Sequence, residues 1–304
     1  MNTKFQGTKL RLKLFVVFTF VIAWILFLLI PVLGIPYGQI GSILFAAAAM
    51  FAPTAGNILT RLVTKEGFRD MYLRPRFKGN WKYYALAFFG PSAMLLISGA
   101  VYFLLFPGTF DPDLTILKTI AEKNGSISMS AGQMLLISIA QIVVIGPIIN
   151  IIPTLGEELG WRGYLLPKLR ETYSDRKALV ITGVIWGVWH APVIAQGHNY
   201  GTDYWGFPYL GILMMVVFCV SLGIIEGYVT IKTKSAIPAA MIHSAFNAGA
   251  GLPIYMAKSG YNALLGPTMA GLIGGLPLIL LAAVLFFKSN PKANSIGEME
   301  AKSE

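Results

Sequence analysis

The sequence predicts an all-α fold: a polytopic membrane helix bundle with about eight transmembrane helices and both termini in the cytoplasm. Hydrophobic residues make up 55% of its 304 residues and charged residues only 12%, about half of the ~25% that is typical of soluble domains. So few charges could not cover the surface of a water-soluble protein of this size. The single cysteine, Cys219, excludes an intramolecular disulfide bond and a zinc site built on cysteines.

Eight segments are apolar enough and long enough to cross a bilayer, which takes about 20 residues. They cover approximately residues 13–34, 38–60, 82–106, 133–156, 178–196, 208–231, 236–256 and 266–287. The first follows a basic stretch, as in a signal peptide, but its apolar run is too long and no A-x-A-like cleavage site follows it. We therefore expect a retained helix, one transmembrane domain over residues 1–287 and a polar cytoplasmic tail over 288–304.

The basic residues predict the orientation of the bundle. Twenty of the 24 Lys and Arg residues lie near the two ends or in alternate gaps, on what would be one side of a membrane. The opposite side carries Lys118, Lys123 and Lys258. This asymmetry predicts cytoplasmic termini, and it accounts for the net charge of +10 without a nucleic-acid partner.

A few ionisable or strongly polar residues fall within the apolar segments or directly beside them. A charged group at mid-membrane costs about 2.5–3.5 kcal/mol, so such residues usually face a polar interior and mark function. The set is Glu157, Glu158, Arg162, His190, Glu226, His243 and Asn247. For Glu226, close to the cytoplasmic end of its segment, we expect only that the side chain reaches the membrane interface.

The spacing of these residues assigns them to helix faces. Glu158 and Arg162 are four residues apart, which predicts an ion pair on one face. Glu157 lies about 100° around the helix and is expected to be the free carboxylate. Trp186 shares a face with His190, and His243 shares one with Asn247. Glycines four residues apart, at 156/160, 183/187, 223/227 and 271/275, predict close approach of the helices that carry them.

A carboxylate, two imidazoles and an amide suit acyl chemistry that uses water. A glutamate can take a proton from water, and an imidazole can orient that water or pass the proton on. A second imidazole and a carboxamide can donate hydrogen bonds to an oxyanion. The sequence contains no G-x-S-x-G, H-E-x-x-H or phosphate-binding glycine motif.

Three motifs resemble those of the CAAX-processing and bacteriocin-processing (CPBP, or Abi) family of intramembrane glutamic proteases. They are Glu157-Glu158-x-x-x-Arg162, Trp186-x-x-x-His190 and His243-x-x-x-Asn247, within a motif-bearing core of about residues 150–250. The resemblance implies an eight-helix bundle with a cavity facing the cytoplasm. It also implies that Glu157 and His190 activate water, that His243 and Asn247 form the oxyanion hole, and that Glu158 and Arg162 brace the site. Trp186 is a departure, because the family pattern usually has Phe there.

The resemblance predicts a multi-pass enzyme of the plasma membrane that cleaves a membrane-associated protein or peptide, either a CAAX C-terminus or a bacteriocin-related substrate. No cofactor is expected. Two other classes stay open. One Glu and two His are also the ligands of some catalytic zinc sites, which would make the protein a zinc hydrolase. The same buried residues could instead relay protons or bind a ligand in a non-proteolytic immunity or transport protein.

Overall fold

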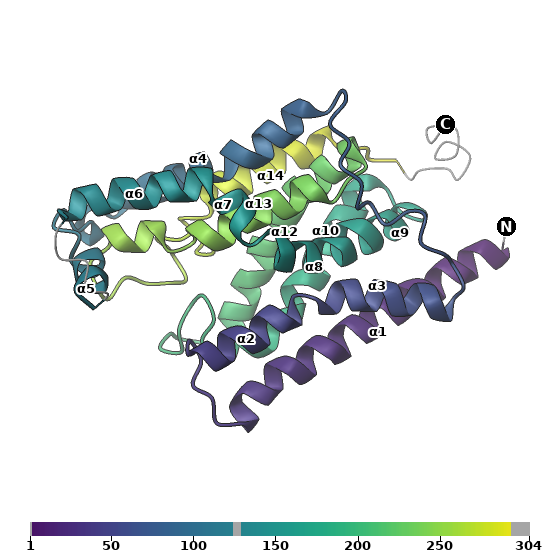
Figure 1. Cartoon of the computed structure of the whole chain (residues 1–304), viewed down its shortest axis with the longest axis horizontal. Coiled ribbons are helices and arrows are strands. Elements are labelled where there is room, and N and C mark those ends of the chain that lie inside the picture. The colour runs from purple at the N-terminus through teal and green to yellow at the C-terminus, as the bar shows by residue number, and fades with distance from the viewer. Residues whose placement is uncertain (1, 124–128, 293–304) are drawn as a thin grey trace.

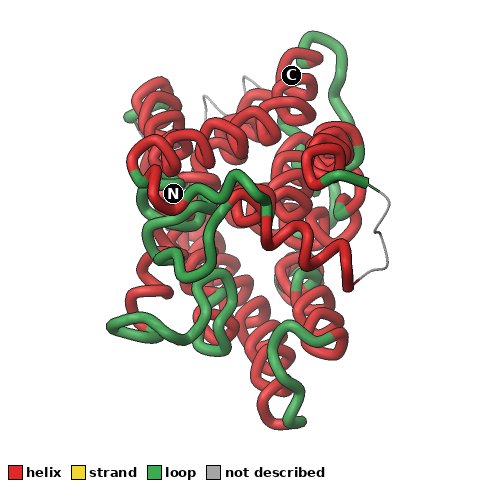
Figure 2. The backbone as a smooth tube through the Cα atoms, turned by 90° about the vertical axis from the view of Figure 1, so that its left-hand side faces the viewer, coloured by secondary structure: helices red, strands yellow, loops and turns green. Residues whose placement is uncertain are grey.

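The computed structural model describes residues 2–123 and 129–292, and throughout this part of the chain the regular structure is helical (Figures 1 and 2). The α-helices are α1 Asn2–Val32, α2 Ile40–Ala49, α3 Ala52–Val63, α4 Trp81–Leu105, α5 Thr115–Lys123, α6 Ala131–Val144, α7 Gly146–Ile149, α8 Ile151–Gly160, α9 Leu166–Arg170, α10 Asp175–Trp189, α11 Ala191–Ile194, α12 Tyr209–Thr233, α13 Ile237–Gly249 and α14 Leu276–Lys288. Short 3₁₀ turns cover Pro107–Thr109 and Leu252–Met256, and a π-helical turn covers Trp161–Leu165. Most of the predicted tail, residues 293–304, lies outside the described residues.

The prediction of a polytopic membrane helix bundle is confirmed. Four helical stretches of the described chain are long and apolar enough to cross a membrane, namely Gly7–Val32, Ile40–Val63, Trp81–Leu105 and Tyr209–Thr233. Two shorter apolar helices, Ala131–Val144 and Leu276–Lys288, add to them. The last predicted segment is helical only from Leu276, since residues 266–275 form turns.

Several predicted segments are interrupted helices. The segment predicted at 133–156 consists of α6, α7 and α8, which are separated at Ile145 and Asn150, and Pro147 follows the first break. The segment predicted at 178–196 breaks at His190, between α10 and α11. Irregular backbone at membrane depth is tolerated where other protein groups surround it, and π-helical turns such as 161–165 occur often at functional sites. The break at His190 and the π-helical turn at 161–165 therefore lie within the motifs that the sequence singled out, whereas the breaks at Ile145 and Asn150 precede them.

The helices that carry the motifs lie in the middle of the bundle. Figure 1 shows α8 and α10 between a layer formed by α1, α2 and α3 and a layer that contains α4, α6 and α14. The helix α8 packs against α3 and α13, while α10 packs against α12. The buried core includes three large indoles, those of Trp161, Trp186 and Trp189. Because the polar motifs face this interior, they can meet one another instead of lipid.

Glycines allow the closest of these helix contacts. For three of the four pairs of glycines four residues apart, the predicted close approach of their helices is confirmed. A Cβ atom added at Gly183 or Gly187 on α10 would lie 2.5 Å from the Cα atom of Val220 or Val216 on α12. A Cβ atom added at Gly160 on α8 would lie 2.3 Å from the Cβ atom of Pro53 on α3. The fourth pair, 271/275, was interpreted wrongly, because these glycines pack against the turn that surrounds them.

Replacing Gly187 by alanine is expected to lower the free energy of unfolding by about 1–3 kcal/mol, the usual cost of overpacking. The new methyl group would overlap the backbone of α12, so α10 and α12 would have to move apart. Thermal unfolding of the detergent-solubilised protein measures the effect. Gly132→Ala in α6, where nothing lies within 4 Å of the added atom, is the matched control. Equal stability of the two variants would contradict the prediction.

A polar cluster around Glu66 ties the N-terminal helix to α9. The Glu66 carboxylate pairs with Lys168 and accepts a hydrogen bond of 2.9 Å from the Tyr164 hydroxyl. Arg11 of α1 lies 3.5 Å from the same carboxylate. Burial raises the pKa of Glu66, but the Lys168 ammonium, the Tyr164 hydroxyl and Arg11 together outweigh it, so the net pKa is lowered. The ionised form of Glu66 is therefore favoured in the folded protein.

Replacing Glu66 by glutamine is expected to cost about 1 kcal/mol of stability at pH 7, a value kept small because the partners are partly exposed to solvent. A lowered pKa in the folded state means that the stabilisation is complete above the pKa of the unfolded chain and is lost as the pH falls through the folded-state value. The difference between wild type and variant should thus disappear in acid. Thermal unfolding at several pH values measures it, with Glu122→Gln on exposed α5 as the control. A difference that did not change with pH would contradict the prediction.

Candidate active site

The site begins with two adjacent glutamates near the end of α8, which point to different partners. The Glu158 Oε1 atom accepts a hydrogen bond of 2.9 Å from Arg162 Nη1, and both side chains are fully buried. The expected ion pair between Glu158 and Arg162 is therefore present. Glu157 makes no ion pair with Arg162, in agreement with its position about 100° around the helix.

Glu157 is held through one of its two carboxylate oxygens. Its Oε2 atom accepts hydrogen bonds from the indole nitrogens of Trp186, at 2.8 Å, and Trp161, at 3.2 Å. Its Oε1 atom accepts no hydrogen bond from any described residue. The side chain is 2% exposed, so the two indoles fix its orientation. One oxygen is thus anchored and the other is available to a reactant.

Trp186 on α10 connects most of the site. The Arg162 guanidinium lies 4.2 Å from the centroid of a Trp186 ring, a cation–π geometry. The rings of His243 and His190 lie 5.3 Å and 5.9 Å from it. Phenylalanine, the usual residue in the family pattern, could fill this space but could not donate the indole hydrogen bond to Glu157.

His243 on α13 reaches the second glutamate. Its Nδ1 atom lies 3.0 Å from Glu158 Oε1, so the opposite nitrogen, Nε2, points away from this contact. Asn247 lies one turn further along α13 and is exposed. The described residues provide no hydrogen-bond partner for its amide. His243 Nε2 and the Asn247 amide therefore both lack a hydrogen-bond partner among the described residues.

His190 forms the break between α10 and α11. Its Nδ1 atom lies 2.9 Å from the Trp186 carbonyl oxygen, which can only accept a hydrogen bond. Nδ1 therefore carries a proton, and in the neutral ring Nε2 is a free acceptor. Within the described chain no hydrogen bond joins His190 to Glu157. The two residues meet through Trp186, which contacts one with its indole and the other with its backbone.

Two further residues lie near His190 that the sequence did not assign to the site. The Cys219 Sγ atom of α12 is 3.9 Å from its Nδ1 atom. The His198 ring stacks on the His190 ring at 6.3 Å, and His198 Nδ1 lies 2.6 Å from the Tyr37 hydroxyl. Nothing in the local sequence around His198 indicates this stacking. Only the turn after α11 brings His198 back over His190.

Glu226 is the main difference from the sequence-based prediction. It was expected to reach the membrane interface, but it is 0% exposed. Its Oε2 atom lies 2.6 Å from Arg162 Nη2, so Arg162 pairs with two carboxylates. The interface prediction was wrong because α12 crosses the bundle beside α10 and buries this face. The glycines at 223 and 227, on either side of Glu226, were the available signal for such a crossing.

The donor atoms that could hold a metal ion are not those expected from the sequence. In the described part of the chain, Glu158, Glu226 and His243 form the one group of three whose ligand atoms lie within 4.8 Å of one another. Arg162 forms ion pairs with both of these carboxylates and competes for the lone pairs that a cation would need. The donor set therefore suits a guanidinium better than Zn²⁺.

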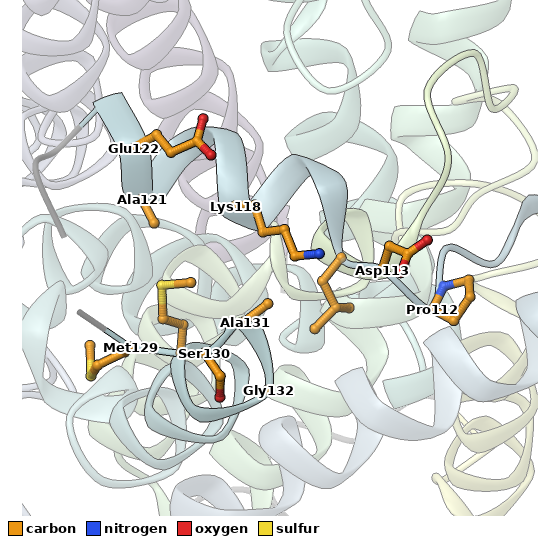
Figure 3. A pocket seen from close by; sticks show the side chains of 11 residues that line it. Pro112, Asp113, Lys118, Ala121, Glu122, Met129, Ser130, Ala131 and Gly132 are labelled. Atoms are coloured by element: carbon orange, nitrogen blue, oxygen red, sulfur yellow. The ribbon is translucent and has the colours of Figure 1, made fainter. Parts of the chain in front are cut away.

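A separate cleft of about 530 Å³ lies between α5 and α6 (Figure 3). Asp113, Lys118, Glu122 and Ser130 are among the residues that line it. None of the motif residues on α8, α10, α12 or α13 contributes to its wall. We therefore assign no part of the chemistry to this cleft.

Comparison with known proteins agrees with the motifs. Residues 134–249 match the model of the type II CAAX prenyl endopeptidase Rce1-like family. This range includes every residue of the site described above except His198's partner Tyr37. A stretch of 86 residues is 33% identical to CAAX prenyl protease 2 of Methanococcus maripaludis. The aligned part covers 28% of this chain and 32% of the relative, so it spans about a third of the relative's length.

Proposed function

We propose that this chain is a member of the CPBP family and an intramembrane endopeptidase that uses Glu157 to activate water. The observation that carries the proposal is the asymmetric environment of the Glu157 carboxylate. Two indole hydrogen bonds hold Oε2, while Oε1 is available as a base. General bases of this kind contribute about 10²–10⁴-fold to a rate.

The reaction proceeds by addition of water to the scissile carbonyl group. Glu157 Oε1 takes one proton from the water, whose oxygen forms a bond to the carbonyl carbon. The carbonyl π electrons move onto oxygen, and His243 Nε2 and the Asn247 amide stabilise the resulting oxyanion. When the oxyanion collapses, the C–N bond breaks and the amine leaves with the proton that Glu157 had taken. The products are a new carboxyl terminus and a new amine.

His190 has a supporting part in this scheme. Because its Nδ1 atom is held by the Trp186 carbonyl, its Nε2 atom can accept a hydrogen bond from the attacking water and orient it. Glu158 and Arg162 hold His243 and Trp186 in place through the ion pair and the cation–π contact. The proposed roles are therefore Glu157, His190, His243 and Asn247 in catalysis and Glu158, Arg162 and Trp186 in support.

The proposed substrate is the C-terminus of a membrane-anchored CAAX protein. The names of the matching family and of the archaeal relative refer to CAAX prenyl substrates, and a lipid anchor would bring such a chain to a site enclosed by membrane helices. We place the protein in the plasma membrane with the site open to the cytoplasm, where the positive-inside pattern puts the termini. A bacteriocin-related peptide is the alternative substrate.

Cleavage of a defined peptide tests the proposal. The full-length protein in lipid nanodiscs is incubated with a peptide that ends in a CAAX sequence, with and without a farnesyl group, and the products are identified by mass spectrometry. We expect loss of the last three residues from the farnesylated peptide and at least about tenfold slower cleavage of the bare one. Absence of any product from both peptides and from a bacteriocin precursor would contradict a proteolytic function.

Removal of metal ions distinguishes the glutamic mechanism from a zinc-dependent one. The zinc alternative is tested because ligand atoms of Glu158, Glu226 and His243 lie close enough together to bind an ion. We expect the rate to stay within about twofold after treatment with EDTA or 1,10-phenanthroline, since the proposed steps need no Lewis acid. Metal content is measured in the same samples. Loss of activity that Zn²⁺ restores would replace the glutamic mechanism by a zinc-dependent one.

A further inference from the structure

We propose that Glu226 is a positioning residue of the active site: it balances the charge of Arg162, so that Glu158 can hold His243 as an imidazolium. This inference rests on the proposed function, because it concerns the oxyanion hole of the same site. Glu226 matches none of the three family motifs and lies on α12, a helix that carries none of them.

The geometry makes Glu226 a direct partner of Arg162. Both side chains are 0% exposed, and the distance from Arg162 Nη2 to Glu226 Oε2 is 2.6 Å. One turn earlier on α12, Gly223 leaves the space that the guanidinium occupies, because a Cβ atom there would lie 3.2 Å from Arg162 Nη2. The helix thus provides both the room for Arg162 and the anion that Arg162 meets.

The charges explain why a second carboxylate is needed. A guanidinium stays charged in proteins, and a buried charge without a partner is strongly unfavourable. If Glu158 were the partner of Arg162 by itself, its negative charge would be neutralised there. With Glu226 paired to Nη2, Arg162 is shared between two anions. Glu158 then retains negative charge for its other contact, the 3.0 Å approach of His243 Nδ1.

The protonation state of the His243 ring decides whether its Nε2 atom can stabilise an oxyanion. A carboxylate only accepts hydrogen bonds, so His243 Nδ1 must carry a proton to bond to Glu158. In a neutral imidazole, Nε2 would then have no proton and would repel an oxyanion. Nε2 can donate only when the ring is an imidazolium with both nitrogens protonated. Glu226 therefore acts on the reaction through Arg162, Glu158 and His243, without touching the substrate.

Nitrogen NMR of the histidine rings tests the inference without any substrate. The chain has three histidines, so ¹⁵N-histidine labelling gives three ring systems that single substitutions assign. In the wild-type protein at pH 7 we expect both nitrogens of His243 to be protonated. In Glu226→Gln, which keeps the shape but removes the charge, we expect one proton on His243. A singly protonated His243 in the wild type, or no change in the variant, would overturn the inference.

Kinetics provide the second readout. Glu226→Gln is expected to lower kcat by about 10–100-fold, less than or comparable to removal of an oxyanion donor, with KM unchanged within about twofold. Glu226→Asp keeps the charge and should recover most of kcat. Glu122→Gln on exposed α5 is the matched control and should equal the wild type. A purely structural role would instead reduce the amount of folded protein and leave kcat per folded molecule unchanged, which would overturn the inference.

The two measurements separate this inference from the proposed function. If the wild type cleaves no peptide, the proposed function fails, and the protonation of His243 still decides the role of Glu226. If Glu226→Gln does not fold, the histidine NMR spectra of the wild type and of Glu226→Asp decide the role of Glu226. An imidazolium in both of these proteins supports the inference, and a neutral ring in either contradicts it.

Discussion

Replacing Glu157 by glutamine is expected to lower kcat by about 10³-fold, within the range for removal of a general base. The glutamine carbonyl oxygen can still accept both indole hydrogen bonds that Oε2 accepts now, so the site should keep its shape. The amide cannot take a proton from water, so the chemical step loses its base. Cleavage of the farnesylated CAAX peptide under single-turnover conditions measures this effect.

The neighbouring glutamate provides a comparison within the same site. Glu158→Gln removes the charge that holds His243 and Arg162 and should lower kcat less than Glu157→Gln does. Thermal unfolding of the Glu157→Gln variant should match the wild type, which shows that the lost activity is not lost structure. A Glu157→Gln variant with full biological effect in cells would favour the non-proteolytic immunity or transport function.

Replacing Arg162 by leucine is expected to lower the free energy of unfolding by about 3–5 kcal/mol, the cost of breaking a buried ion pair from one side. Arg162 pairs with Glu158 and Glu226, and all three side chains are fully buried. Without the guanidinium, the Glu226 carboxylate would stay in the protein interior with no cation paired to it, and Glu158 would keep only its contact with His243. Size-exclusion chromatography and thermal unfolding in detergent measure how much folded protein is left.

A compensated variant tests the electrostatic reason for this loss. Combining Arg162→Leu with Glu158→Gln and Glu226→Gln removes the unpaired charges and should restore part of the stability, though not the activity. Arg69→Leu, at an exposed position between α3 and α4, is the matched control and should change stability by less than about 0.5 kcal/mol. Normal stability of the single Arg162→Leu variant would show that the buried network contributes little to folding.

The sequence predicted the class of fold and the ion pair between Glu158 and Arg162. Composition and apolar segment length indicate a membrane bundle because lipid requires long apolar helices. Polar residues within those segments stand out because their burial in lipid is costly. Helical periodicity then separated Glu157 from the Glu158–Arg162 pair, and the structure bears this out. These are properties of single helices, which a sequence can specify.

The tertiary structure decided how the helices meet. Gly223 of α12 leaves room for Arg162 to pair with Glu226, and the turn after α11 stacks His198 on His190. The glycine spacing predicts that helices approach closely, but not which side chains then meet, because those contacts depend on the angle and depth at which separate helices pack. The sequence by itself thus determined which polar groups must leave the lipid. Tertiary packing determined which of these groups form ion pairs or hydrogen bonds with one another. Such interactions act only over a few ångströms, and packing decides which side chains come that close.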